Sequence, residues 1–232
     1  MKTPLALGVD LGSSGLRIAL VAAHGPQLLT EAGPYPNGLE DPLGWASGFE
    51  ALCARLPAAS RIRIGAVAVA GTSGTLLLCR PTGEPGPGSL GQALPYHRAC
   101  GDQAEAAAAL AGSGPATSAS GSLARGLHLL AQADLAGEAG PWLWRHQADW
   151  LMGWLLGDWR WGEEGNNLRL GWNLQRQAWS GSIAQQQWAP ALPEICASGS
   201  VLGSMAPKLA ERLGLPRHCR VVAGTTDANA GV

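Results

Sequence analysis

Two short turns of small residues, each beside an aspartate, carry the chemistry that this sequence suggests. The first turn, Gly12-Ser13-Ser14-Gly15, follows Asp10 in the stretch LGVDLGSSGLRIALVA. Consecutive small residues expose backbone N–H groups that can bind phosphate oxygens, and the serine hydroxyls add donors. A carboxylate beside such a turn can hold a magnesium ion through water, because magnesium keeps much of its hydration shell. Taken alone, this turn is explained equally well as an ordinary hairpin with an incidental aspartate.

The second turn has the same arrangement near the end of the chain. In AGTTDANAG, Asp227 follows an apolar strand and two threonines. A general base must lie within hydrogen-bond reach of the hydroxyl that it deprotonates, and an aspartate between a strand and a helix is held rigidly enough for this. One turn therefore suits phosphates and the other suits an alcohol. Because phosphoryl transfer to an alcohol needs mainly positioning and charge stabilisation, the pair favours that reaction.

Other phosphate and nucleophile motifs do not match. The residue after Gly12 is Ser13, so no Walker A lysine is present, and a strand rather than a helix follows the turn, unlike a dinucleotide-binding fingerprint. The chain contains no G-x-S-x-G pentapeptide, the signature of a hydrolase nucleophile. These absences leave the strand–turn–strand hairpin as the candidate phosphate site.

The amino-acid composition restricts the classes of molecule that the protein is expected to bind. Charged residues make up 14% of the 232 positions and the net charge is −1, so no basic surface argues for nucleic acid or for an anionic membrane. The N-terminus does not resemble a signal peptide. The longest apolar segment, WLMGWLLGDW, is far shorter than the roughly 20 residues of a membrane span. We therefore expect a cytoplasmic protein that binds small molecules, with neither nucleic acid nor membrane as a partner.

Cysteine and tryptophan both favour a structural interpretation. The five cysteines have neither C-x-x-C nor zinc-ligand spacing, and we expect buried free thiols in a reducing cytoplasm: Cys53, Cys79, Cys100, Cys196 and Cys219. Nine of the ten tryptophans lie between Trp142 and Trp188. Such residues can form a stacking surface for sugars or bases, but core packing is the more common use.

Hydrophobic patterning predicts an α/β domain whose mixed sheet has helices on both faces. Leu5–Asp10 and Leu16–Ala22 are predicted to form an antiparallel hairpin, with a third strand at Gln27–Ala32. A helix capped by Asp41 follows, then a strand that ends at Gly71.

The second half of the chain is predicted to be mainly helical before it returns to the sheet. Its helices are RACGDQAEAAAALAG, SLARGLHLLAQA and WLMGWLLG, the last capped by Asp149. A buried strand then leads to Asp227. Because apolar strands precede Asp10, Thr72 and Asp227, we expect these three residues to open onto one edge of the sheet, around one cleft.

With these motifs in this order, from about Leu5 to Val232, the sequence resembles the FGGY carbohydrate kinases of the actin-like, ribonuclease H-like ATPase superfamily. The similarity is best to the xylulokinase and D-ribulokinase branch. GVDLGSSGLRIAL resembles the first phosphate motif, and VAVAGTSGTLLLC resembles a strand followed by a sugar-contacting turn. PYHRA stands where relatives have a sugar-binding segment, and VVAGTTDANAG resembles the segment with the catalytic aspartate.

The resemblance implies a role for each motif. Asp10 would place magnesium–ATP through water, with Gly12, Ser13 and Ser14 near the phosphates. Arg17 would assist there or form a structural salt bridge. The residues implied at the sugar are Thr72, Ser73, Gly74, Tyr96, His97 and Asp227, and Asp227 would also be the catalytic base.

Two departures from the family leave the sugar open. Tyr96-His97 replaces an Asn-Asp pair of relatives, so an acidic sugar contact is lost, and His97 is either a substitute contact or a surface residue. Glu163, Asn166 and Asn167 are further candidates near the sugar. Glu163 and Glu164 are not expected to work as an acid/base pair, because neighbours in a loop point apart.

The implied activity is transfer of the ATP γ-phosphate to a sugar hydroxyl, with a ketopentose, D-ribulose or D-xylulose, as the expected substrate and another polyol or sugar of the same family as the alternative. Family members have two actin-like domains with the active site between them. Residues 1–232 are expected to be the N-terminal, sugar-binding domain, without the ATP-binding domain. An exposed interdomain face would favour self-association or a separate second kinase domain as partner. The alternatives are a catalytically inactive sugar-binding or interaction module, and an actin- or chaperone-like ATPase, which would not need the sugar segments.

Overall fold

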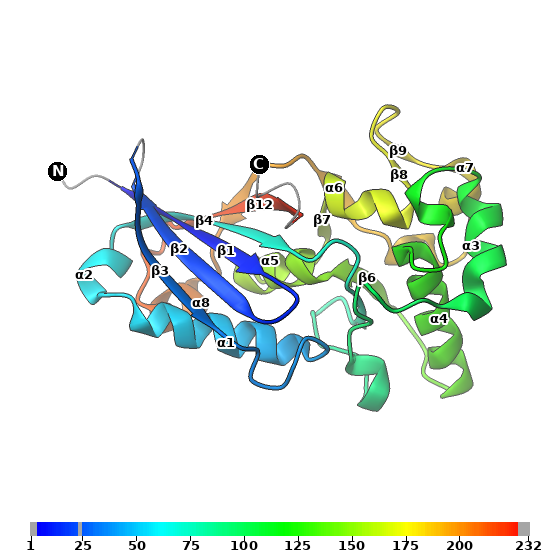
Figure 1. Cartoon of the computed structure of the whole chain (residues 1–232), viewed down its shortest axis with the longest axis horizontal. Helices are drawn as coiled ribbons and strands as arrows, with labels where there is room; N and C mark the ends of the chain where they lie inside the picture. Colours follow the sequence, from blue (N-terminus) through cyan, green and yellow to red (C-terminus); the bar gives the residue numbers. More distant parts are fainter. Residues whose placement is uncertain (1–3, 23–24, 227–232) are drawn as a thin grey trace.

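A computed structural model describes residues 4–22 and 25–226 of the chain. Its centre is a six-stranded sheet in the order β11-β12-β4-β1-β2-β3 (Figure 1). The strands are β1 Leu5–Leu11, β2 Leu16–Ala22, β3 Gln27–Gly33, β4 Ile64–Gly71, β11 Val201–Ser204 and β12 Arg220–Thr226. The first three strands form an antiparallel meander, whereas β4 runs parallel to both β1 and β12. The predicted hairpin and the mixed α/β class are confirmed.

Alternation along the strands decides which face of the sheet is buried. In β1, Leu5, Leu7, Val9 and Leu11 are buried, whereas the residues between them are at least partly exposed. These side chains share one core with α1 (Pro42–Arg55), α5 (Gln147–Leu156) and α8 (Pro207–Leu213). The period of two thus directs one row of aliphatic side chains onto the helices.

Helix α1 forms as its sequence predicts. The side chain of Asp41 accepts a 3.0 Å hydrogen bond from the backbone N–H of Leu43, and Pro42 occupies the first turn. Trp45, on the same helix, is fully buried against the sheet. The cap fixes where the helix starts and therefore which of its side chains meet β1 and β2.

The opposite face of the sheet is lined by small side chains. Gly8, Ala68 and Gly224 on three adjacent strands are all only partly buried. Gly224 sits at an irregularity in the β12–β4 pairing, where a Cβ atom would lie 1.9 Å from the carbonyl oxygen of Val69. Only glycine permits this approach of the two backbones.

A second lobe is inserted between β4 and β12, with its own core (Figure 1). It is built on the antiparallel pair of β5 (Leu76–Cys79) and β6 (Leu143–His146), covered by α4 (Ser122–Leu135). The other helices and strands are α2 Ala58–Arg61, α3 Ala104–Ala111, β7 Trp161–Glu163, α6 Glu164–Asn167, β8 Trp172–Asn173, β9 Ala178–Trp179, α7 Gly181–Ala184 and β10 Glu194–Cys196. Short 3-10 turns include Gly101–Gln103, which occupies the first part of the predicted alanine-rich helix.

One predicted cap is wrong. Helix α5 begins at Gln147 with His146 in the N-cap position, and Asp149 lies inside the first turn. The carboxylate of Asp149 instead accepts a hydrogen bond of 2.9 Å from the backbone N–H of Glu163. The Asp149 carboxylate therefore binds a residue 14 positions away instead of the N–H groups at the start of its own helix.

Other predictions about packing hold. The five cysteines are free and buried. Trp142, Trp144 and Trp150 are buried, and five more tryptophans of the 142–188 segment are partly buried against the two cores: Trp154, Trp159, Trp161, Trp179 and Trp188. Across the described ranges 4–22 and 25–226, we find no helix with the length and apolar character that crossing a bilayer requires.

Candidate active site

Three parallel strands bring the two aspartate-bearing motifs to one edge of the sheet. Leu11 at the end of β1 lies opposite Gly71 at the end of β4, and Thr226 at the end of β12 lies opposite the same Gly71. Asp10 is therefore at this edge, and the backbone N–H of Thr72 donates a 3.1 Å hydrogen bond to the carbonyl oxygen of Leu11. Asp227 lies outside the described residues, so its side chain is not placed.

The turn between β1 and β2 is open to solvent. Ser13 and Ser14 are exposed, and the N–H of Gly12 donates to the carbonyl oxygen of Gly15 at 3.0 Å. A cavity of about 380 Å³ beside the turn is lined by Asp10, Gly12, Ser14 and other residues of β2 and β3. The first motif thus presents a carboxylate, a hydroxyl and backbone around one hollow.

Arg17 also borders this cavity and faces Asp10 across the hairpin. Its Nη1 atom lies 3.8 Å from Oδ2 of Asp10, and both side chains are substantially exposed, by 63% and 43%. A long, solvated ion pair of this kind contributes little to stability. The arginine is therefore free to turn toward an anion at modest cost.

A second, shallower groove crosses the small-residue face of the sheet. It has a volume of about 290 Å³, and Gly8, Asp10, Ala70, Gly224 and Thr225 are among its lining residues. Asp10 and Thr225, which come from opposite ends of the sequence, therefore border the same hollow. Thr72 does not line this groove and Asp227 lies outside the described residues, so the expectation that Asp10, Thr72 and Asp227 surround one cleft stays a prediction.

Thr72 is buried, with only 2% of its surface exposed, and its hydroxyl belongs to an internal network. Its Oγ1 donates to Oε1 of Gln147 at 2.8 Å and lies 2.6 Å from Oγ1 of Thr75. Because the Thr72 proton goes to Gln147, the Thr75 hydroxyl is the donor in the second bond. Ser73, the next residue, is partly exposed.

The same glutamine connects this turn to the first one. Nε2 of Gln147 donates to the hydroxyl oxygen of Tyr35 at 3.1 Å, and that hydroxyl donates to the carbonyl oxygen of Gly12 at 2.7 Å. Burial raises the pKa of Tyr35 strongly, so the phenol keeps the proton that it donates. A continuous line of hydrogen bonds therefore joins the Gly12 turn to the Thr72 turn.

Arg125 holds the second turn against the segment that contains Tyr96. Its Nε donates to the carbonyl oxygen of Gly74 at 2.9 Å, and its Nη1 donates to the carbonyl oxygen of Tyr96 at 3.1 Å. The guanidinium is fully buried, and burial lowers its pKa to about 10. Gly74 has φ of +103°, a conformation that favours glycine. Ser73 and Tyr96 are thereby fixed relative to each other.

The two ring side chains of the PYHRA segment lie at the surface. Tyr96 is 36% exposed and His97 is exposed, with their rings packed edge to face at 5.2 Å. The backbone N–H of Tyr96 donates to Oγ1 of Thr75 at 3.1 Å. The segment therefore has an anchored backbone and accessible rings.

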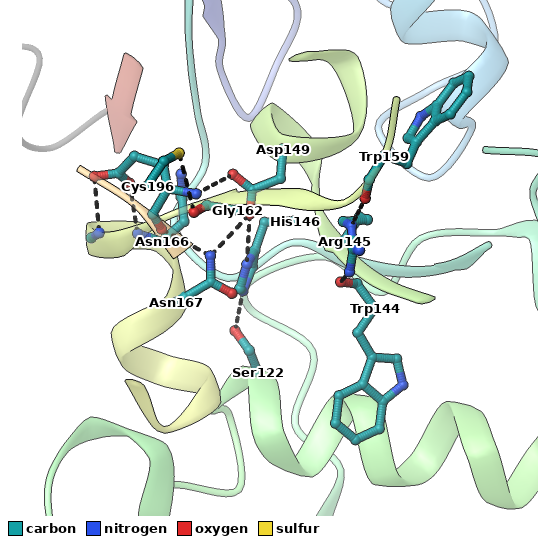
Figure 2. Close-up of polar contacts among 12 residues, drawn as sticks. Ser122, Trp144, Arg145, His146, Asp149, Trp159, Gly162, Asn166, Asn167 and Cys196 are labelled. Carbon is teal, nitrogen blue, oxygen red and sulfur yellow. Dashed lines mark hydrogen bonds and ion pairs between the residues drawn. The ribbon is translucent and has the colours of Figure 1, made fainter. Parts of the chain in front are cut away.

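The GEEGNN segment forms a buried polar cluster with α5 (Figure 2). Glu163 caps α6 by accepting from the N–H groups of Gly165 and Asn166, each at 2.9 Å, and it also accepts from the Ser198 hydroxyl. Burial raises the pKa of Glu163, and Asp149 adds to that rise. Glu164 is partly exposed.

Asn166 and Asn167 occupy different positions in this cluster. Nδ2 of Asn167 donates to Oδ2 of Asp149 at 3.1 Å, next to the 3.5 Å contact between Asp149 and His146. The Asn166 side chain is fully buried, and neither its Nδ2 nor its Oδ1 finds a hydrogen-bond partner in the part of the chain that the structure describes. Because α6 contacts β12, this unsatisfied amide belongs to the element beside the second aspartate motif.

Comparison with solved structures places this arrangement among known folds. The chain matches the gluconate kinase of Lactobacillus acidophilus with a TM-score of 0.77 at 13% identity, over 98% of this chain and 49% of that one. The xylulose kinase of Rhodospirillum rubrum matches with a TM-score of 0.77 at 20% identity, over 97% of this chain and 50% of that one. The glycerol kinase of Plasmodium falciparum with ADP matches with a TM-score of 0.78 at 14% identity, over 98% of this chain and 49% of that one.

The fold is that of the actin-like ATPases. The chain spans about half the length of the kinases that it matches. No protein-family model matches the sequence. At these sequence identities the similarity establishes the fold alone. Any catalytic activity depends on the residues at the edge of the sheet.

Sequence reasoning missed the residues that hold the two turns in place. Tyr35, Gln147 and Arg125 were not singled out, although each bonds a turn that was. The position of Arg125 could have been recognised from the sequence, because it lies four positions before Leu129 on the apolar side of its helix. A charged residue on a buried helix stripe needs partners, and here the partners are backbone carbonyls.

Proposed function

We propose that this chain is the sugar-binding half of an ATP-dependent carbohydrate kinase that acts on a ketopentose such as D-ribulose or D-xylulose. The observation that carries the proposal is the groove at the ends of β1, β4 and β12, which Asp10 and Thr225 border together. The groove is bordered by Asp10, whose carboxylate suits a metal-bound nucleotide, and by Thr225, which is two residues before Asp227.

The first turn suits the phosphate end of ATP. The hydroxyl of Ser14 offers a donor at the cavity, the exposed Ser13 hydroxyl lies next to it in the turn, and Arg17 can add a positive charge. Asp10 fits magnesium, because a single partly exposed carboxylate that leaves room for water is what that ion accepts. When bound there, the metal would neutralise charge on the transferring phosphoryl group.

The sugar would lie between the Ser73–Gly74 turn and the Tyr96–His97 segment. Arg125 fixes these two segments relative to each other, which is the rigidity that a binding site for a small polyol needs. Thr72 serves the site through its bonds to Gln147 and the neighbouring backbone, since its hydroxyl is already engaged. Asn166 adds a buried amide that has no partner among the described residues and that a sugar hydroxyl would satisfy.

In the proposed reaction, a sugar hydroxyl oxygen attacks the γ-phosphorus while the bond from that phosphorus to the ADP oxygen breaks. The hydroxyl proton passes to the carboxylate of Asp227. Ser13, Ser14 and Arg17 stabilise charge on the phosphates, and the products are the sugar phosphate and ADP. The residues of this chain would thus bind the acceptor sugar and supply the base and part of the phosphate binding.

The test compares two aspartates in the longest natural form of the protein that phosphorylates sugar. Asp227→Asn should lower kcat by roughly 10²–10⁴-fold and leave calorimetric sugar binding nearly unchanged, because a base acts as the hydroxyl attacks. Asp10→Asn should weaken the use of magnesium–ATP as well as lowering the rate. Asp134→Asn, at an exposed position of α4, is the matched control and should leave both properties unchanged.

Wild-type-like kcat in Asp227→Asn would remove that residue from the mechanism. If the wild-type protein binds ribulose or xylulose and never consumes ATP, the chain is a binding module and the kinase proposal fails. If it phosphorylates only another polyol, the kinase assignment stands and the ketopentose assignment falls.

A further inference from the structure

A second group of chemically active side chains lies on the lobe that is inserted into the sheet domain. Cys100 follows the PYHRA segment, Asp102 lies in the 3-10 turn Gly101–Gln103, and His128 comes from the middle of α4. Their Sγ, carboxylate oxygen and ring nitrogen atoms all lie within 4.8 Å of one another. Among the residues that the structure describes, this is the only place where three potential metal ligands converge so closely.

We propose that Cys100, Asp102 and His128 form a binding site for Zn²⁺. A thiolate, an imidazole and a carboxylate are the three kinds of side chain that zinc accepts, whereas magnesium and calcium select oxygen ligands alone. Zinc bonds of about 2.0–2.3 Å bring tetrahedral ligands within about 4 Å of each other, so only a small inward movement is needed. A solvent molecule completes the coordination.

Hydrogen bonds to the backbone that do not involve a metal hold the segment of Cys100 against α4. The backbone N–H of Cys100 donates to the carbonyl oxygen of Ala119 at 2.9 Å, just before α4. Arg125 donates from Nη1 to the carbonyl oxygen of Arg98 at 2.7 Å, which anchors the chain two residues before the cysteine. The ligands from the turn and the ligand from α4 are therefore already held side by side.

Without metal, two of the ligands bind each other. Nδ1 of His128 lies 2.8 Å from Oδ2 of Asp102, and this hydrogen bond lowers the pKa of that carboxyl group. Zinc would take the place of the shared proton on Nδ1. The accessible edge of the site suits an exchangeable ion, since the side chains of His128 and Asp102 are 22% and 51% exposed.

The charges around Cys100 come from both sides of the site. Burial raises the pKa of the Cys100 thiol, and the Asp102 carboxylate adds to the rise, whereas Arg125 and Arg98 oppose it. The thiolate is the form that binds a metal ion, and zinc bound at Cys100 would stabilise that form.

A bound zinc ion would tie the 3-10 turn to α4 directly beside the Tyr96–His97 segment. Arg125, which lies three residues before His128 on the same helix, already binds the carbonyl oxygens of Tyr96 and Arg98. Zinc would add a second connection between the same two elements. Occupation of the site is thus expected to stabilise that segment, whatever substrate the protein has.

The experiment uses the full 232-residue chain, without a histidine tag and freed of metal, titrated with Co²⁺ as a spectroscopic substitute for zinc. One equivalent should produce a thiolate-to-cobalt charge-transfer absorption that Zn²⁺ abolishes. Cys100→Ser should remove this absorption, whereas Cys53→Ala, which changes a buried cysteine elsewhere, should keep it. Circular dichroism confirms that each variant is folded.

The two exposed ligands give a second measurement that does not depend on replacing the buried cysteine. Asp102→Asn and His128→Gln should each weaken zinc affinity by at least the roughly 10–100-fold that follows loss of a supporting outer-shell partner. Zinc should raise the thermal midpoint of the wild type and raise it less in both variants. The proposal is overturned if no charge-transfer absorption forms, if it persists in Cys100→Ser, or if these two variants bind zinc as tightly as the wild type.

Discussion

The hydroxyl of Tyr35 donates a 2.7 Å hydrogen bond to the carbonyl oxygen of Gly12 while it accepts one of 3.1 Å from Nε2 of Gln147. Gln147 in turn accepts from the hydroxyl and the backbone N–H of Thr72 through its Oε1. The backbone N–H of Thr72 is shared, because it also donates to the carbonyl oxygen of Leu11 at 3.1 Å. The phenol of Tyr35 and the amide of Gln147 therefore add a side-chain connection between the two turns to the backbone pairing of β1 and β4.

Replacing Tyr35 by phenylalanine should reveal this connection. The variant leaves the Gly12 carbonyl without its donor and the Gln147 amide without its acceptor, which should cost about 1–2 kcal/mol of unfolding free energy in urea. In a double-mutant cycle, Tyr35→Phe and Gln147→Leu should be non-additive by about 0.5 kcal/mol or more. Tyr96→Phe, at the half-exposed tyrosine, is the control and should change stability by less than about 0.5 kcal/mol. Additive effects would show that the line does not act as a unit.

Arg125 should be costly to replace even by a side chain of similar length. Arg125→Met leaves the carbonyl oxygens of Gly74, Tyr96 and Arg98 without their donor, so we expect a loss of about 2–4 kcal/mol. Arg176→Met, at an exposed arginine, should be neutral within about 0.5 kcal/mol. Urea unfolding of the two variants makes the comparison. Equal stabilities would contradict the anchoring role.

Glu163 should impose a pH dependence of a specific sign. Its pKa in the folded protein is raised from 4.5 by burial, so the folded state holds the proton more tightly than the unfolded chain. The stabilisation from the protonated group is complete below about pH 4.5 and is lost as the pH rises through the folded pKa. The stability of the wild type relative to Glu163→Gln should therefore fall as the pH rises above about 4.5.

The measurement for Glu163 is a series of urea titrations across this pH window. Glu105→Gln, at an exposed glutamate of α3, should give a constant difference from the wild type. A difference for Glu163→Gln that grows with pH would mean that the capping hydrogen bonds from Gly165, Asn166 and Ser198 outweigh burial.

Gly224 should tolerate no side chain. A Cβ atom there would lie 1.9 Å from the carbonyl oxygen of Val69, and its nearest neighbours are backbone atoms of Val69 and Ala70, which cannot rotate away as a side chain could. Gly224→Ala should lose more than about 3 kcal/mol, beyond the usual cost of overpacking, or fail to fold. Gly181→Ala is the control, because nothing lies within 4 Å of its added Cβ. Similar unfolding midpoints for both variants would disprove the close approach.

Sequence reasoning succeeded where the determining interactions are local. The β1–β2 hairpin and the Asp41 cap are specified within a few residues, by alternation and by a side chain that bonds its own helix. The position of Asp10 and Thr72 at one edge of the sheet was also predictable, because the strands that precede them are parallel and end on the same side.

It failed where the partner comes from elsewhere in the chain. Asp149 bonds the backbone of Glu163 rather than its own helix, and Gln147 meets Thr72 across 75 positions. Arg125 could be recognised as out of place on an apolar stripe, but its carbonyl partners become adjacent only after the second lobe has folded. The roles of the individual side chains at the site, Asp227 above all, remain predictions.

The insertion of a lobe between β4 and β12 has a consequence for the order of folding. Val67 pairs with Val221, so the sheet is completed by strands about 150 positions apart in the chain. For a flexible chain this contact would be slow to form, because the closure entropy precedes any gain from pairing. The second lobe has its own core, so it can fold before β4 and β12 pair. Once folded, it holds the end of β4 and the start of the return segment close together, and less chain remains to be ordered. Docking of β12 should then be the last step of refolding, and the edge of the sheet should acquire its third strand only when both cores exist.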